Sequence, residues 1–185
     1  HAGFPFLEAG TVSTKNEVNA FNKIIFDWSV TTVLYLLIGY PLAYGKFLYL
    51  NIADFTGSNG FEFVRFFFLV GFAACIPAII SGGVAGRMKF YAQSIAGVFI
   101  ATMIYPFFES LVWGQHSFMG QAGSLFAQLF GTPFHDFAGS VVVHSLGGWI
   151  ALPAIILLKP RKGRYSGHFD IRPNSIPFLV LGSWI

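Results

Sequence analysis

Four long apolar runs divide this sequence, and they constrain its fold more than any other feature. They cover residues 24–44, 61–85, 90–113 and 137–158, and a fifth run begins near residue 176 and is still apolar at residue 185. A helix needs about 20 apolar residues to cross a bilayer, and each of the four runs is that long. Their solid apolar character differs from the period-two alternation of a membrane β-barrel. The sequence therefore predicts an all-α polytopic membrane protein.

Composition supports this class and excludes others. Hydrophobic residues make up 55% and charged residues 10% of the 185 positions, whereas a soluble domain carries about 25% charged residues. Cys75 is the single cysteine, so no intrachain disulfide can form and a zinc cluster lacks its thiolates. The excess of 11 basic over 8 acidic residues is small. We expect the lipid bilayer as a partner, and no nucleic acid, cofactor or metal.

The two ends of the sequence are also apolar. Residues 1–10 are too few to cross a bilayer, and we interpret them as the end of a span whose beginning is missing. The run after residue 176 is interpreted as the start of another span. We therefore expect one transmembrane domain over residues 1–185, with about five spans, the first incomplete, plus the start of a sixth.

Basic residues are concentrated in alternate loops. One set of loops holds Lys15, Lys23, Arg87, Lys89, Lys159, Arg161, Lys162, Arg164 and Arg172, and the other set holds Lys46 and Arg65. Cytoplasmic loops retain lysine and arginine. The bias of nine to two predicts that residues 159–172 are cytoplasmic and that residues 45–60 and 114–135 face outward.

Polar residues inside a membrane are costly, so each one suggests a function. Asp136, Ser140 and His144 recur every four residues, which predicts one stripe along a helix, continued by Gly147 and Gly148. Asp136 begins its run, where a carboxylate commonly caps a helix. His144 lies two turns deeper. It could hydrogen-bond a neighbouring helix or relay a proton or a substrate, and the glycines are typical of close helix packing.

Aromatic residues mark the outer ends of two spans. Phe68 and Phe72 share one helix face at a spacing of four residues, which is typical of a packed pair. Trp113 ends its run at the outer interface, where tryptophan is common and where its π face could instead bind a cation. Glu109 precedes Trp113 by four residues, so it places a carboxylate one turn from the same mouth.

Two further spacings predict structural contacts. Lys23 and Asp27 are four residues apart, so we expect them to form a neutralised pair on one helix. Gly82 and Gly86 have the spacing of small residues at a close helix crossing.

Six blocks of sequence carry a family resemblance and keep their order along the chain. They are Phe6–Gly10, Ser13–Asn16, Ile80–Phe90, Tyr105–Pro106, Val112–Gly114 and Asp136–Ser145. Together they resemble the Amt/Mep/Rh superfamily of ammonium transporters, and its Amt branch in particular. The resemblance implies an eleven-helix bundle of two inverted five-helix repeats, assembled as a homotrimer in the plasma or inner membrane. The chain then corresponds to the first repeat, with the C-terminal half absent.

The resemblance also implies a site. Trp113 and Phe72 match the aromatics of the outer ammonium-recruitment site, and Phe68 is one turn from Phe72. His144 matches the first of two pore histidines, and Asp136 matches an acidic residue that supports recruitment. Ser140 and Glu109 are further candidates. The implied function is recruitment of NH₄⁺ at the aromatic site, followed by conduction of NH₃, with its proton handled separately, through a hydrophobic pore lined by histidine.

Three classes of function stay under consideration. The same fold serves ammonium sensors, in which a signalling domain beyond Ile185 would read the bound ion, and a PII-type regulator is a further implied partner. An enzyme is not expected, because His144 has no acidic or cysteine partner at helical spacing in the membrane. The sequence departs from the family pattern at Gly86, where an acidic residue is usual, and at Glu109, where a small or uncharged residue is usual.

Overall fold

The structure, a computed structural model, describes residues 1–115, 117–161, 163–165 and 172–185, and within them every regular element is helical. The α-helices are α1 (Gly3–Thr11), α2 (Glu17–Leu34), α3 (Tyr40–Tyr44), α4 (Ile52–Thr56), α5 (Phe61–Val84), α6 (Phe90–Phe99), α7 (Tyr105–Val112), α8 (Leu125–Phe130), α9 (Leu146–Leu158) and α10 (Ile176–Trp184). The π-helical segments are η2 (Tyr35–Gly39), η4 (Ile100–Ile104) and η5 (Ser140–Ser145), and the 3-10 segments are η1 (Thr14–Asn16) and η3 (Gly57–Gly60). Lys162 lies outside the described residues.

Consecutive elements join into helices that can span a membrane. Among the described residues there are four of these: Thr14–Tyr44, Phe61–Val84, Phe90–Val112 and Ser140–Leu158. They coincide with the four predicted runs, so the all-α polytopic fold is confirmed. Two boundaries differ, since the first helix begins before residue 24 and the last begins after residue 137. The first helix extends into polar residues before residue 24, and the last helix starts later than its apolar run does. Hydropathy alone does not locate either boundary.

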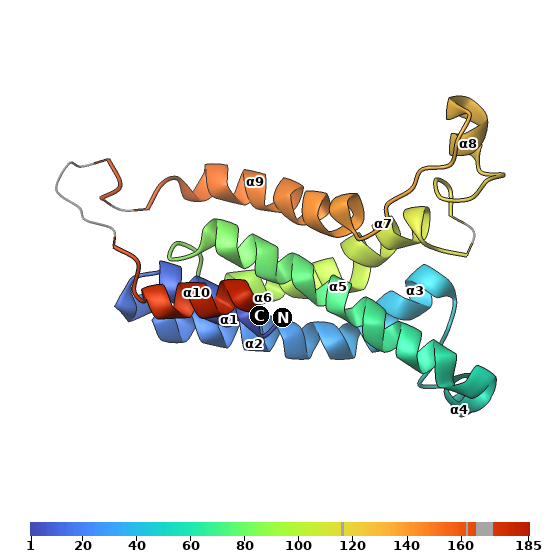
Figure 1. Cartoon of the computed structure of the whole chain (residues 1–185), viewed down its shortest axis with the longest axis horizontal. Coiled ribbons are helices and arrows are strands. Elements are labelled where there is room, and N and C mark those ends of the chain that lie inside the picture. The colour runs from blue at the N-terminus through green and yellow to red at the C-terminus, as the bar shows by residue number, and fades with distance from the viewer. Residues whose placement is uncertain (116, 162, 166–171) are drawn as a thin grey trace.

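The spans run back and forth along one axis (Figure 1). Helix α9 packs on α5, and the two short helices α1 and α10 lie side by side against α2. Residues 45–60, 113–115 and 117–139 lie at one end of the bundle, and residues 85–89, 159–161 and 172–175 lie at the other (Figure 1). The two sets of loops that differ in their number of basic residues therefore lie at opposite ends of the molecule.

Many large apolar side chains lie on the surface of this bundle. Phe67, Trp149 and Leu157 are 68%, 70% and 81% exposed. On a soluble protein such a surface would favour aggregation, but a bilayer is the solvent for it. The interior is filled by side chains such as Tyr35, Ile76 and Val142, which are completely buried. Burial and hydropathy therefore agree with a multi-pass membrane protein.

Glycines bring two pairs of helices into close contact. A Cβ atom on Gly182 would lie 2.5 Å from the backbone nitrogen of Leu7, so α1 and α10 touch through their backbones. Gly147 is buried against Ile79, which a Cβ would approach to 3.1 Å, and this contact joins α9 to α5. Gly148 meets nothing within 4 Å. Small residues at such crossings let membrane helices approach closely.

The expected packing role of Gly82 and Gly86 is wrong. Gly82 has open space where a Cβ would be, and Gly86 has left the helix with φ of 71°, in the left-handed region that favours glycine. The glycine of this segment that packs is Gly83, whose Cβ would lie 3.3 Å from the methyl of Ala151. A side chain at Gly86 would strain this backbone conformation.

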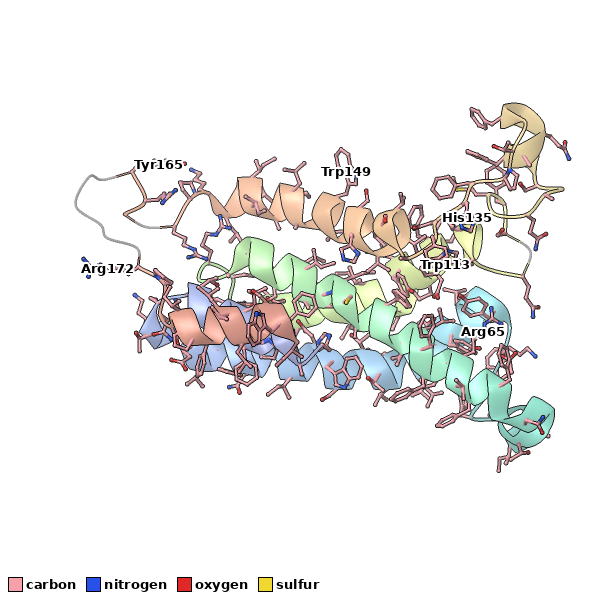
Figure 2. All side chains as sticks on the ribbon, viewed as in Figure 1. Arg65, Trp113, His135, Trp149, Tyr165 and Arg172 are labelled. Atoms are coloured by element: carbon pink, nitrogen blue, oxygen red, sulfur yellow. The ribbon has the colours of Figure 1, made fainter. Side chains whose placement is uncertain are left out.

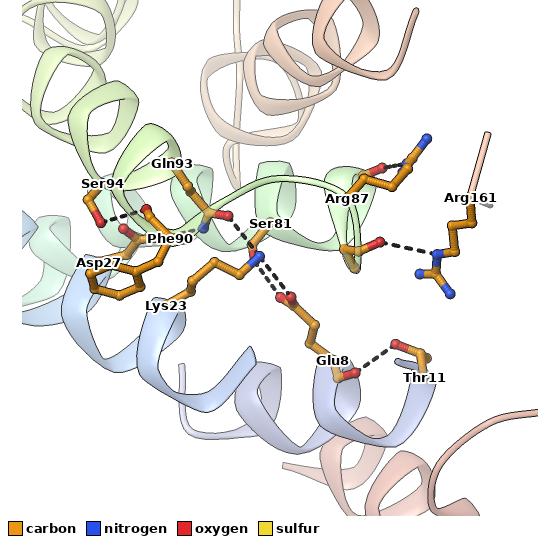
Figure 3. Close-up of polar contacts among 12 residues, drawn as sticks. Glu8, Thr11, Lys23, Asp27, Ser81, Arg87, Phe90, Gln93, Ser94 and Arg161 are labelled. Atoms are coloured by element: carbon orange, nitrogen blue, oxygen red, sulfur yellow. Dashed lines mark hydrogen bonds and ion pairs between the residues drawn. The ribbon is translucent and has the colours of Figure 1, made fainter. Parts of the chain in front are cut away.

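A buried polar network joins α1, α2, α5 and α6 (Figure 3). The Lys23 Nζ lies 3.3 Å from the Glu8 Oε1 and donates a 3.0 Å hydrogen bond to the Gln93 Oε1. The Gln93 amide donates to the Asp27 Oδ2 at 2.7 Å, and the Ser81 hydroxyl donates to Glu8. The expected pairing of Lys23 with Asp27 is therefore wrong, because Gln93 bridges the two side chains.

Lys23 was also wrongly counted among the basic residues of the loops. Lys23 belongs to helix α2, and its side chain is 1% exposed. This burial is possible because Glu8 and Gln93 provide the partners that its ammonium group needs. Removing Lys23 from the nine basic loop residues leaves eight against two. The orientation with residues 159–172 in the cytoplasm is still predicted by this bias.

Candidate functional site

An aromatic cavity of about 320 Å³ lies at the end of the bundle where α3 and α7 end and α5 begins. Its lining consists of Tyr44, Phe61, Arg65, Phe68, Leu69, Phe72, Trp113 and Phe137. Figure 2 places Arg65 and Trp113 at this end, and Tyr165 and Arg172 at the opposite end. Six of the eight lining side chains are aromatic, so π faces and ring edges make up most of its wall.

Three of the candidate residues meet in this wall. The rings of Phe68 and Phe72 are 5.0 Å apart and nearly perpendicular, at 72°. The rings of Phe72 and Trp113 are 5.7 Å apart at the same angle. Edge-to-face contacts of this kind hold aromatic side chains in fixed orientations. The structure thus brings Phe68, Phe72 and Trp113 together as one continuous aromatic surface.

Trp113 is held by a hydrogen bond as well as by ring contacts. It follows the last residue of α7, and its indole Nε1 donates a 2.8 Å hydrogen bond to the backbone carbonyl oxygen of Asp136. This bond connects the end of the third span to the segment that leads into the fourth. The indole plane is therefore fixed by two elements that are far apart in the sequence.

Asp136 has a structural role that the sequence suggested. Its carboxylate accepts hydrogen bonds from the backbone N–H groups of Ser140, Val141 and Val142, at 2.9, 3.0 and 2.7 Å. The first N–H groups of a helix have no partner within the helix, and a carboxylate also interacts favourably with that end of the helix dipole. Asp136 therefore caps the fourth span.

The predicted stripe of Asp136, Ser140 and His144 is only partly formed. Asp136 lies before the helix, because Gly139 has φ of 81° and the helix starts at Ser140. Phe137, at the start of the predicted run 137–158, is likewise outside the helix and lines the aromatic cavity. Ser140 and His144 remain on one exposed face, while Val142 and Val143 between them are buried.

His144 lies in the π-helical turn at the start of the fourth span. Its backbone N–H donates to the carbonyl oxygen of Gly139 at 2.9 Å, and its ring Nδ1 is 3.4 Å from the same oxygen. The imidazole is exposed in this structure and does not line the aromatic cavity. Its other ring nitrogen, Nε2, is available to a further group. π-Helical turns of this kind occur frequently at functional sites.

Glu109 differs most from its expected position. Its side chain is completely buried, at 0% exposure, and does not line the aromatic cavity. The Tyr35 hydroxyl lies 2.9 and 2.8 Å from its two carboxylate oxygens, and the Tyr44 hydroxyl donates to Oε1 at 2.8 Å. The tyrosines enclose the carboxylate within the bundle, so it is not an open charge at the mouth.

Sequence reasoning missed five of the eight residues that line the cavity, namely Tyr44, Phe61, Arg65, Leu69 and Phe137. Tyr44 lines the cavity with its ring while its hydroxyl binds Glu109, and the guanidinium carbon of Arg65 lies 4.2 Å from the centre of that ring. Phe137 was assigned to the wrong element. The spacing of Arg65 from Phe68 and Phe72 is a helical signal that could have identified it, whereas Tyr44 comes from another helix and gives no such local signal.

The fold and the cavity define a multi-pass helical membrane protein with an aromatic cavity at one end and a histidine on the adjoining span. The sequence pattern of the Ammonium Transporter Family matches residues 1–185. The chain belongs to this family.

Relatives in other organisms agree with this assignment. A putative ammonium transporter of Synechocystis sp., sll1017, is 39% identical over 90% of this chain and 38% of its own length. Ammonium transporter Amt2 of Archaeoglobus fulgidus is 35% identical over the whole chain and 41% of its own length. A solved structure named "Sensor Amt Protein" matches with a TM-score of 0.80 at 28% identity, covering 99% of this chain and 47% of that one. The chain thus spans less than half the length of these three proteins.

Proposed function

We propose that the intact protein moves ammonium across the plasma or inner membrane. The observation that carries this proposal is the aromatic cavity formed by Phe68, Phe72 and Trp113, beside a span whose exposed face presents His144. Membership of the Ammonium Transporter Family supports the substrate. From the same family resemblance we also propose a homotrimer and a PII-type regulator as a cytoplasmic partner.

The chemistry of the ion fits these residues. NH₄⁺ leaves water only where hydrogen-bond acceptors and π faces replace its hydration, and cation–π contacts contribute about 0.5–2 kcal/mol each. A charged species is costly at the centre of a bilayer, so neutral NH₃ crosses more easily. A neutral imidazole at His144 can accept a proton at one nitrogen or donate one from the other. We propose that the aromatic cavity binds the cation and that His144 contacts the species that crosses.

Sensing is the second candidate function. The observation that favours it is the solved relative, which is named as a sensor and covers this chain almost completely. In that case the aromatic cavity would bind ammonium, and a signalling domain would respond to it. The same residues would then control a response and little net transport.

Replacing His144 tests the proposal. His144→Ala in the intact protein should keep the assembly intact on size exclusion, since the side chain is exposed and fills no core position. In proteoliposomes it should abolish the ammonium-dependent current or open a leak to other cations. Ser145→Ala, at the next position of the same π-helical segment, is the matched control and should behave as the parent protein does.

The outcomes separate the two functions. Currents and ion selectivity equal to those of the parent protein in His144→Ala would show that this residue takes no part in transport. Ammonium binding without any current in the parent protein would favour the sensor, and His144→Ala should then alter the signalling response instead.

A further inference from the structure

A positively charged side chain of the protein itself lies in the wall of the aromatic cavity. Arg65 lies three residues before Phe68 and seven before Phe72, so all three share one face of α5 and all line the cavity. The guanidinium carbon of Arg65 is 4.2 Å from the centre of the Tyr44 ring. This is the geometry of a cation–π contact. One π face of the cavity is therefore already occupied by a cation that belongs to the protein.

A buried carboxyl group lies on the other side of this contact. The Tyr44 hydroxyl donates a 2.8 Å hydrogen bond to the Glu109 Oε1, and the Glu109 side chain is 0% exposed. Within the described part of the chain, no lysine or arginine forms an ion pair with Glu109. Hydrogen bonding to a carboxylate polarises the phenol, which increases the attraction of its ring for a cation. The arrangement of Glu109 and Tyr44 thus favours a cation on the open face of the ring.

Arg65 has a second partner that it can move toward. Glu62 lies one turn earlier on α5, with its Oε1 3.9 Å from an Arg65 guanidinium nitrogen. Its Oε2 accepts a 2.9 Å hydrogen bond from the Tyr40 hydroxyl, which fixes its position. The Arg65 side chain is about a quarter exposed, so it has room to move from the Tyr44 ring toward Glu62.

We propose that the face of Tyr44 is a second subsite for ammonium and that Arg65 is a tethered competitor for it. This inference rests on the proposed function of the aromatic cavity. An ammonium ion that enters the cavity meets a like charge until Arg65 withdraws to Glu62. Arg65 therefore raises the ammonium concentration needed for half-saturation, and it excludes cations that are too weakly held to displace it.

Neutralising Arg65 gives the main test. The half-saturating ammonium concentration is measured in the intact protein, as current in a transporter or as the bound fraction in a sensor. Arg65→Gln should lower this concentration about tenfold at roughly 0.1 M salt, because a nearby like charge is removed. The difference should shrink at about 1 M salt, where charges are screened within about 3 Å. Arg65→Lys keeps the charge and is the conservative rescue.

A matched control removes a charge elsewhere on the same side. Lys46 is the other basic residue of the predicted outer loops and does not line the aromatic cavity. If Lys46→Gln lowered the half-saturating concentration as much as Arg65→Gln does, general surface charge would explain the effect, and the proposal would be overturned. An Arg65→Gln protein with unchanged or higher half-saturation would overturn it too.

Glu62→Gln provides an independent test with the opposite sign. It removes the group that Arg65 moves toward, so the half-saturating concentration should rise, and a fall or no change contradicts the proposal.

Trp113→Leu separates this inference from the proposed function. If Trp113→Leu weakens ammonium binding while Arg65→Gln changes nothing, the aromatic site stands and only the competitor fails. If Trp113→Leu has no effect, the proposed recruitment at this cavity is itself wrong.

Discussion

The indole nitrogen of Trp113 and the backbone carbonyl oxygen of Asp136 lie 2.8 Å apart, across the gap between the third and fourth spans. The carboxylate of the same Asp136 caps the fourth span through three backbone N–H groups. One residue thus fixes a helix start with its side chain and an aromatic ring with its main chain. The geometry of the aromatic cavity therefore depends on a helix cap.

The first prediction concerns this cap. Asp136→Ala should destabilise the protein by about 1–2 kcal/mol, as the loss of other helix caps does. It should also weaken ammonium binding, because the backbone carbonyl that accepts from Trp113 is no longer held in place by the cap. Asp136→Asn retains one carbonyl acceptor of the original two oxygens and should fall between. Thermal unfolding in detergent and the half-saturating ammonium concentration measure the two effects.

A cap at another helix serves as the control for Asp136. The Ser124 hydroxyl accepts a hydrogen bond from the Ala127 N–H at the start of α8, far from the aromatic cavity. Ser124→Ala should lower stability without changing the concentration dependence. If Asp136→Ala changed only stability as well, the link from the cap to Trp113 would be disproved.

The second prediction concerns Glu109. Glu109→Ala leaves the hydroxyls of Tyr35 and Tyr44 without their partner and creates a cavity in the bundle, so we expect a loss of about 3–5 kcal/mol in unfolding free energy. Glu109→Gln keeps the shape and one acceptor oxygen and should lose less. Thermal unfolding distinguishes them, with Tyr91→Phe as a control at an exposed ring on α6. Equal stability of all three variants would contradict a structural carboxylate.

The third prediction concerns the buried ion pair. Lys23→Met leaves the Glu8 carboxylate buried without its cation, which typically costs about 3–5 kcal/mol. Adding Glu8→Gln should restore much of that loss, because the carboxylate that Lys23 paired with is then uncharged. Lys15→Met removes an exposed lysine and should change little. A double variant that is less stable than Lys23→Met alone would show that the pair is not coupled.

The fourth prediction concerns orientation. In a Cys75→Ser background, cysteine at Gln121 should react with an impermeant thiol reagent added outside intact cells. Cysteine at Tyr165, which is exposed at the opposite end of the bundle, should react only after permeabilisation. The reverse pattern would mean that the eight-to-two bias of basic residues does not set the topology of this protein.

The spans could be predicted from sequence because each one is a local property. Hydropathy within about 20 residues decides whether a segment can cross a bilayer, and no partner needs to be known. The pair of Phe68 and Phe72 is local in the same sense, since one helix turn fixes it. The cap at Asp136 was also accessible, because carboxylates favour helix starts.

The contacts that were missed join distant segments. Lys23 has a carboxylate four residues away, yet its ion pair is with Glu8 on another helix, because Gln93 occupies the space beside Asp27. Glu109 was assigned to the mouth on spacing alone, and only the fold shows the tyrosine hydroxyls that enclose it. Side-chain partners from other helices decide such positions, and periodicity contains no information about them.

The backbone contact between α1 and α10 has a consequence for how the protein is made. Gly3 and Gly182 lie against each other, and a Cβ on either one would come within 2.7 Å of backbone atoms of the other helix. Ribosomes add about 5–20 residues each second, so the partner of α1 emerges roughly 10–40 s after α1 itself. During that interval the first helix enters the membrane with its glycine surface uncovered.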